Sequence, residues 1–225
     1  MRQIILDTET TGLSPREGHK IIEIGCVEAI KKIRTGNVFH AYINPQREVS
    51  AGAFKVHGLS TNFLQDKPLF KDIAKDFLDF IKDSELIIHN ARFDMGFINH
   101  ELESINFKAI SKNSVIDTLM LARKKFPGSP ANLNALCKRF NINLEERDKK
   151  GHGALLDSEL LYRVYICLTE GIQSELLTKK ETKVTVSAGK KERMPPRKFS
   201  YAEDFARQKQ FLGDKIPKSL WEKQD

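Results

Sequence analysis

The feature that most constrains the fold of this chain is the order of its apolar segments. Three short runs rich in β-branched residues come first, at 3–6, 21–30 and 38–43, and the polar segment 31–37 separates the last two. Runs of this length and composition are typical of strands, so we expect a first strand that stops at the turn signal 10–12, and then a hairpin. The chain therefore begins with three strands.

From residue 70 onwards the pattern changes to alternating helices and strands. Apolar residues three and four apart predict an amphipathic helix over 70–81. A strand at 85–89 follows, then a helix whose apolar stripe runs from Met95 to Ile105, and then a brief extended segment at 115–117. Further helices are expected at 119–126, 133–140 and 154–169. A series of strands followed by alternating helices and strands predicts an α/β domain with a mixed sheet covered by helices.

The composition narrows the possible classes of protein. Of the 225 residues, 40% are hydrophobic and 30% are charged, and no run approaches the roughly 18 apolar residues that a membrane helix needs. The N-terminus reaches Asp7 too early for a secretory signal, so we expect a cytoplasmic protein without a membrane partner. Cys26, Cys137 and Cys167 lie far apart in apolar runs, which predicts buried thiols rather than disulfides or a CxxC metal site.

Most of the net charge of +7 lies in the C-terminal segment. Residues 178–225 contain 13 Lys and Arg against 7 Asp and Glu, so the expected domain over 1–177 is nearly neutral. The segment 178–198 has few apolar residues, which predicts a disordered linker. Apolar residues return over 199–225 and end on Trp221, the only tryptophan. This predicts a flexible tail that docks on a partner, and a frayed terminus without a partner is the alternative.

Four acids occupy equivalent places, at the ends of predicted strands and the starts of predicted helices. Asp7 and Glu9 are two residues apart at the end of the first strand, so their side chains point the same way. At about 4 Å they would repel by on the order of 4 kcal/mol at an effective dielectric near 20, unless they splay apart in a solvated turn. Asp94 follows the fourth strand, and Asp157 lies in the first turn of the last helix. If these acids converge, they suit Mg²⁺ or Mn²⁺ rather than zinc, and two such ions can promote phosphodiester hydrolysis.

His152 precedes Asp157 by five residues and lies between Gly151 and Gly153. The flanking glycines suggest a mobile loop, and an imidazole with its ordinary pKa near 6.5 suits a general base at neutral pH. For this histidine taken alone, a capping or surface role is the alternative.

Together these motifs resemble the DEDDh 3′-5′ exonucleases, most closely the epsilon-type proofreading members. The matching segments are 6–13, 19–25, 56–58, 89–94, 117–119 and 152–157. The resemblance implies a ribonuclease H-like fold in which Asp7, Glu9 and Asp157 bind one divalent metal ion. Asp7, with Asp94 partly through water, would hold a second ion, and His152 would deprotonate the attacking water.

The same resemblance implies a pocket for the terminal nucleotide. The residues it assigns to this pocket are Thr10, Leu13, His57, Asn90 and Phe93, beside the metal-binding Asp7, Glu9 and Asp157. For His57 and Phe93, packing in the core is the alternative. Epsilon-type sequences commonly carry Glu five residues before the position of His57, where this chain has Gly52. The grip on the terminal 3′-hydroxyl is therefore expected to be weaker or differently built.

The implied activity is two-metal removal of nucleoside 5′-monophosphates from single-stranded or frayed DNA 3′ ends, as proofreading for a replicative polymerase. The tail that ends near Trp221 is similar to the segment that docks on the DNA polymerase III alpha subunit. Residues 173–177 are similar to a degenerate sliding-clamp-binding peptide, with a frayed helix end as the alternative. An RNA-directed exonuclease of the ribonuclease T or oligoribonuclease type shares the same catalytic residues and is the enzymatic alternative. A catalytically silent polymerase or clamp adaptor is the non-enzymatic one.

Overall fold

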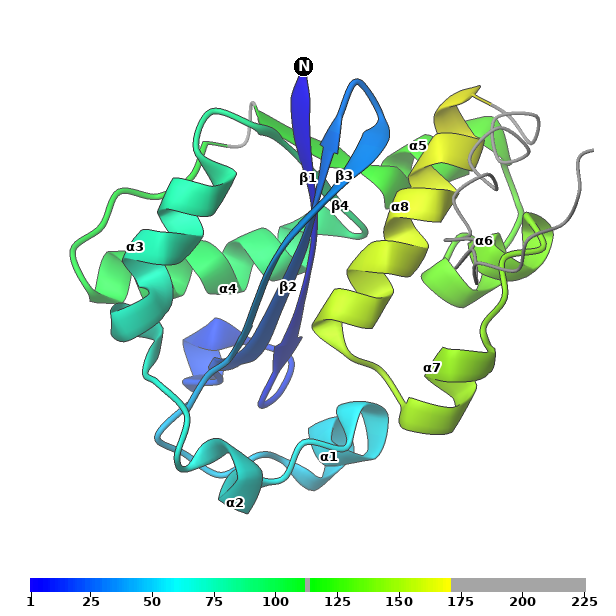
Figure 1. Cartoon of the computed structure of the whole chain (residues 1–225). Helices are drawn as coiled ribbons and strands as arrows, with labels where there is room; N and C mark the ends of the chain where they lie inside the picture. The colour runs from blue at the N-terminus through cyan, green and yellow to red at the C-terminus, as the bar shows by residue number, and fades with distance from the viewer. Residues whose placement is uncertain (112–113, 171–225) are drawn as a thin grey trace, which may run out of the picture. The chain divides into compact units, whose positions relative to one another are not determined.

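The computed structural model describes residues 1–111 and 114–170, and a five-stranded mixed sheet forms its centre (Figure 1). The strands are β1 (Arg2–Thr10), β2 (Ile21–Ile30), β3 (Ile33–Tyr42), β4 (Glu85–Ile88) and β5 (Val115–Asp117). Their order in the sheet is β3-β2-β1-β4-β5. The first three pair antiparallel, whereas β4 and β5 run parallel to β1. The mixed sheet expected from the sequence is confirmed.

The β2–β3 hairpin is tighter than expected. Lys31 and Lys32 have φ angles of 52° and 66°, as in a two-residue type I′ turn, so β3 already begins at Ile33. The expected polar connection over 31–37 was too long because the turn lacks the Asn-Gly or Asp-Gly pair that usually announces this geometry.

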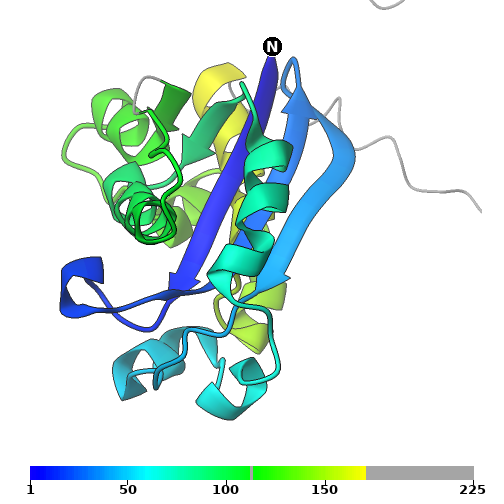
Figure 2. The same ribbon diagram turned by 90° about the vertical axis from the view of Figure 1, so that its left-hand side faces the viewer.

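Helices cover both faces of the sheet (Figures 1 and 2). On one face, α3 (Phe70–Ile81) and α4 (Ala91–Ser104) share a buried cluster with the sheet. On the other face, α8 (Ala154–Glu170) does so together with α5 (Thr118–Lys125) and α6 (Leu133–Arg139). All five helices were expected from apolar periodicity, with bounds that differ by a few residues.

The side chains of β1 alternate between these two cores. Ile4 and Leu6 pack in the cluster of α3 and α4, whereas Ile5 packs in the cluster of α8. Because strand side chains repeat with a period of two, Asp7 and Glu9 continue the row of Ile5 towards α8.

Three short helices were not expected from the sequence, because none is long enough to show a periodic apolar stripe. They are α1 (Ala51–His57), α2 (Thr61–Leu64) and α7 (Glu145–Lys150). Serine side chains cap the first turns of α1 and α2. Figure 1 shows these helices at the end of the sheet where β1 ends, near the short 3₁₀ helix η1 (Pro15–Glu17).

All three cysteines are buried and free, as expected. Within the part of the chain that the structure describes, no helix has the length and apolar character needed to cross a membrane. The predicted linker 178–198, the predicted tail 199–225 with Trp221, and the clamp-like segment 173–177 lie outside the described residues.

Candidate active site

The four predicted acids converge at the C-terminal end of β1. Asp7 and Glu9 come from β1, while Asp94 and Asp157 come from the first turns of α4 and α8. Burial raises the pKa of Asp7 well above its ordinary value, and the charges of the other three acids raise it further. Glu9, Asp94 and Asp157 are also buried, so these side chains are not the splayed, solvated ones of the alternative.

Gly25 allows α8 to reach these carboxylates. It lies opposite Asp7 in the β1–β2 pair, and its carbonyl accepts a 2.8 Å hydrogen bond from Ser158 Oγ. A Cβ at residue 25 would lie 2.2 Å from the backbone nitrogen of Leu155. The first turn of α8 therefore packs directly on the backbone of β2, which brings Asp157 next to Asp7.

Strands β1 and β5 hold Asp94 in place, through Thr8 and Asp117 respectively. Its Oδ1 accepts hydrogen bonds from the backbone N–H of Thr8 at 3.1 Å and from the Thr8 hydroxyl at 2.8 Å. The carboxylate of Asp117 accepts from the backbone N–H groups of Asn90 and Ala91, which fixes the start of α4. Burial raises the pKa of Asp94 to about 7, although the Thr8 hydrogen bonds oppose this shift.

Arg147 is the buried cation of the site, and the sequence reasoning missed it. Its Nε and Nη2 each donate to one carboxylate oxygen of Asp157 at 2.6 Å, and Nη1 donates to Asn134. Nη2 also donates to His152 Nδ1 at 2.9 Å. All six residues of the segment 145–150 are charged, so it carried no signal for a buried arginine.

His152 lies at the edge of the carboxylate cluster, with Nδ1 3.5 Å from Asp157 Oδ2. Its backbone N–H donates to the carbonyl of Val56, and the preceding Gly151 has a φ of 80°. Burial lowers the pKa of His152, and the Arg147 charge lowers it further against the opposing effect of Asp157. The half-buried imidazole is therefore neutral at neutral pH and faces the carboxylates rather than capping α8.

The cluster has the composition of a site for a hard divalent cation. One ligand atom each from Glu9, His152 and Asp157 lie within 4.8 Å of one another. Burial and then the charges of Asp157 and Glu23 raise the pKa of Glu9 to about 8. A divalent cation would relieve this repulsion, and carboxylate oxygens are the ligands that Mg²⁺ and Mn²⁺ prefer. The residues therefore fit the metal ion that the sequence implied.

The pKa of Glu9 predicts how the stability of the metal-free protein depends on pH. The pKa rises from an ordinary value of 4.5 to about 8 on folding, so between these values the folded state holds a proton that the unfolded state has lost. Stability is therefore expected to fall as pH rises through this range, by on the order of 5 kcal/mol, or about 15 °C in Tm. Calorimetry in EDTA measures the slope of Tm against pH for wild type and for Glu9→Gln.

Saturating Mg²⁺ provides the matched condition, because a bound cation favours the ionised carboxylates. We expect the wild-type slope to flatten in Mg²⁺ and the Glu9→Gln slope to be flatter than that of wild type in EDTA. Equal slopes for both proteins in EDTA would contradict the raised pKa of Glu9.

A cavity of about 440 Å³ opens beside the carboxylates and includes Glu23, His40 and His57 in its lining. Glu23 lies opposite Glu9 in the β1–β2 pair, and its Oε1 is 2.7 Å from His40 Nε2. His57 is buried; its Nδ1 accepts from the backbone N–H of Leu59, and its ring also interacts with the backbone of Thr10.

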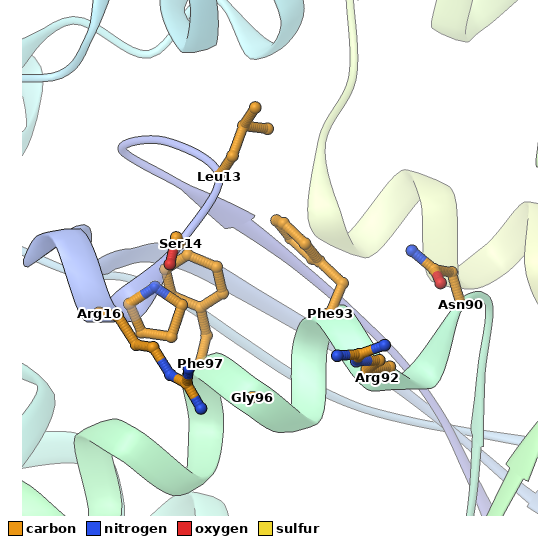
Figure 3. A pocket seen from close by; sticks show the side chains of 9 residues that line it. Leu13, Ser14, Arg16, Asn90, Arg92, Phe93, Gly96 and Phe97 are labelled. Carbon is orange, nitrogen blue, oxygen red and sulfur yellow. The ribbon is translucent and has the colours of Figure 1, made fainter.

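The other predicted nucleotide contacts lie elsewhere. Leu13, Asn90 and Phe93 line a different cavity, of about 470 Å³, between the loop after β1 and α4 (Figure 3). The Thr10 hydroxyl is buried and donates to the carbonyl of Gly12 at 2.6 Å, so it stabilises this loop. Of the residues expected to form one nucleotide pocket, Leu13, Asn90 and Phe93 therefore line one cavity, His57 lines the other and Thr10 lines neither.

Comparison with known proteins identifies the family. Residues 4–165 match the exonuclease family. Over 177 residues the chain is 55% identical to DNA polymerase III subunit epsilon of Rickettsia felis, covering 77% of this chain and 76% of that one. The corresponding protein of Salmonella typhimurium is 49% identical over 177 residues, covering 76% and 72%. Among solved structures, exonuclease X in complex with 5′ overhanging duplex DNA superimposes with a TM-score of 0.57 at 27% identity, covering 75% and 93%.

The chain has a mixed sheet with buried carboxylates at one end, and its sequence matches these proteins. Together these findings identify it as a metal-dependent 3′-5′ exonuclease. The chain belongs to the exonuclease family, in its epsilon-type DEDDh branch.

The close packing of α8 on Gly25 predicts a sensitive position outside the carboxylates. In Gly25→Ala the new Cβ would have to displace the first turn of α8, and with it Asp157. A misplacement on the order of 1 Å costs about 100-fold in rate, so we expect kcat/KM for nucleotide release from an oligonucleotide to fall by about this factor. The matched control is Gly52→Ala, where an added Cβ meets no atom within 4 Å and activity should stay within two-fold. Similar activities for the two variants would contradict this account of α8.

Proposed function

We propose that this exonuclease removes nucleoside 5′-monophosphates one at a time from single-stranded or frayed DNA 3′ ends and proofreads for a replicative DNA polymerase. The observation that carries the proposal is the convergence of Asp7, Glu9, Asp94 and Asp157 beside His152. The identity of 55% to a protein named as an epsilon subunit of DNA polymerase III supports DNA as the substrate and replication as the setting.

The carboxylates would hold two divalent ions, Mg²⁺ or Mn²⁺. Asp7, Glu9 and Asp157 would hold one of them, and Asp7 with Asp94 would hold the other. Bound ions of this kind lower the pKa of water and stabilise the attacking and leaving oxygens of a phosphodiester. Arg147 donates to both oxygens of Asp157, so the guanidinium competes by its charge and its position with a cation that Asp157 would bind.

His152 is the proposed general base. A neutral imidazole is required to take a proton from water, and the lowered pKa of His152 keeps it neutral at neutral pH. The Nδ1 lone pair is engaged by Arg147. Movement of Arg147 would therefore free a ligand oxygen on Asp157 and the ring of His152 in one step.

The test is product analysis with a 5′-labelled DNA strand and the intact chain in Mg²⁺ or Mn²⁺. We expect a ladder that shortens from the 3′ end and releases nucleoside 5′-monophosphates, faster when the terminal base is mispaired. The proposal would be contradicted by release of nucleoside 3′-monophosphates, by attack from the 5′ end or by absence of activity. Absence of activity would favour the adaptor alternative. Equal or faster turnover of RNA of the same sequence would favour the RNA-directed alternative, because the 2′-hydroxyl is what distinguishes the two substrates.

We further propose that the C-terminal tail joins this activity to the polymerase. The support is the aromatic residue Trp221 in the sequence and the similarity to relatives that are subunits of DNA polymerase III. Trp221→Ala should abolish co-purification with the alpha subunit, and undiminished co-purification would refute the anchor. Alanine substitutions in the segment 173–177 test binding to the sliding clamp in the same way.

A further inference from the structure

Glu23 is a buried acid beside the active site that the proposed hydrolysis does not use. It lies on β2, opposite Glu9 in the β1–β2 pair, and only 3% of its surface is exposed. Burying a carboxylate is unfavourable unless the group is paired and hydrogen-bonded. The chain therefore carries this cost directly behind a proposed metal ligand.

The partners of Glu23 differ from those of Glu28, a buried acid five residues further along the same strand. Glu28 pairs with Arg2 and accepts two further hydrogen bonds from neutral side chains of β3. Within residues 1–111 and 114–170, the one hydrogen-bond partner of Glu23 is His40, whose Nε2 lies 2.7 Å from Oε1. The second oxygen of Glu23, Oε2, is therefore left for neighbours other than charged or hydrogen-bonding side chains.

The other neighbour of this carboxylate is the loop that carries His152. A Cβ at residue 153 would lie 3.9 Å from both Oε1 and Oε2 of Glu23. Gly153 follows His152 directly and precedes α8, which begins at Ala154. Both oxygens of Glu23 therefore lie near the backbone that leads from His152 into α8.

The charge of Glu23 suits this position. The N-terminus of a helix carries a partial positive charge, because its first N–H groups have no acceptor within the helix. An anion beside this end stabilises the first turn and the residues that lead into it. The pKa of Glu9, raised by burial and by Asp157 and then by Glu23, shows that the charge of Glu23 acts on the carboxylate cluster as well.

The loop needs a contact that does not depend on Arg147. In the described part of the chain, His152 makes two hydrogen bonds, from its backbone N–H to the carbonyl of Val56 and from Arg147 to its ring. Glycines on both sides leave the backbone of this residue free to move. In the proposed reaction Arg147 moves away from the ring, so the loop loses that contact when the imidazole has to face the attacking water. Glu23 is the neighbour that stays.

We propose that Glu23 is a positioning residue for the exonuclease reaction, and that its carboxylate, oriented by His40, fixes the loop 151–153. Glu23 acts through His152 and touches neither the substrate nor the metal ions. The inference rests on the proposed function for the role of His152 as the general base.

The first test is Glu23→Gln, which removes the charge and keeps the shape. In Mg²⁺ with an octathymidylate, kcat should fall at least about 10-fold at constant KM, because a misplacement on the order of 1 Å costs about 100-fold. The matched control is Glu28→Gln, which weakens the pair with Arg2 and should lower Tm without changing kcat. A raised KM at constant kcat in Glu23→Gln would show a substrate contact instead, and an unchanged kcat would show no role. Either result would overturn the proposal.

A double-mutant cycle tests whether Glu23 acts through His152. In the His152→Ala background, Glu23→Gln should cost less than about two-fold in kcat, because the base that it positions is already absent. Losses that multiply would show that Glu23 acts elsewhere and would refute the inference. His40→Gln keeps a donor for Glu23 and should retain activity, whereas His40→Ala should lose about as much kcat as Glu23→Gln. Full activity of His40→Ala would refute the part assigned to His40.

Amide hydrogen exchange of the metal-free protein gives a readout that does not depend on catalysis. The backbone N–H groups of Gly151, His152 and Asp157 are hydrogen-bonded. They should exchange at least about 10-fold faster in Glu23→Gln than in wild type, and at the wild-type rate in Glu28→Gln. If His152→Ala retains full activity, the proposed general base fails, and this comparison still decides whether Glu23 holds the loop. Unchanged exchange in Glu23→Gln would refute it.

Discussion

Asp7→Asn should lower the rate of nucleotide release by at least about 10⁴-fold and leave the metal-free fold at least as stable as that of wild type. The loss is expected because the proposed arrangement makes Asp7 the one carboxylate shared by both ions. The stability follows from the sign of its pKa shift. Burial and three neighbouring acids raise the pKa of Asp7, so its charged form destabilises the fold at neutral pH, and a neutral amide of the same shape removes that cost.

Single-turnover assays with a labelled oligonucleotide and thermal unfolding in EDTA measure the two halves of this prediction. Asp76→Asn is the matched control, because Asp76 is exposed on α3 and the same change there should affect neither measurement. A lower Tm of Asp7→Asn in EDTA would contradict the electrostatic account, and activity within ten-fold of wild type would refute the role of Asp7 as a shared ligand.

The carboxylates could be predicted from the sequence because local rules place them. The period of two along a strand sets Asp7 and Glu9 on one side, and the ends of strands and starts of helices bring Asp94 and Asp157 to the same end of a sheet. The long helices followed from apolar periodicity for the same reason, since each pattern lies within one element.

The features that could not be predicted depend on contacts between elements. The need for glycine at residue 25 arises from the backbone of α8, more than 125 residues later in the chain. Arg147 is buried only because α7 packs its side chain against Asp157, and a run of six charged residues does not show which of them turns inward. His57 and Phe93, two of the predicted nucleotide contacts, likewise line different cavities because His57 belongs to α1 and Phe93 to α4.

Arg147→Met should destabilise the metal-free protein and increase its affinity for divalent metal. The Arg147–Asp157 pair is buried, with side-chain exposures of 7% and 4%, and the guanidinium binds both oxygens of Asp157. Removing one partner of a buried pair typically costs about 3–5 kcal/mol, which corresponds to a fall in Tm on the order of 10 °C. A metal ion no longer has to displace the guanidinium from Asp157, so saturating Mg²⁺ or Mn²⁺ should restore most of the lost Tm.

The matched control is Arg34→Met, because Arg34 also pairs with an acid of α8, Glu159, but at the surface, with side-chain exposures of 40% and 27%. A surface pair contributes roughly 0–1 kcal/mol, so its loss should shift Tm by no more than about 3 °C and leave metal affinity unchanged. Calorimetric titration with Mn²⁺ and thermal unfolding with and without metal give both quantities for each variant. If Arg147→Met bound metal more weakly than wild type, Arg147 would support the ligands rather than compete for them. The proposed release of Asp157 and His152 by one movement of the guanidinium would then be wrong.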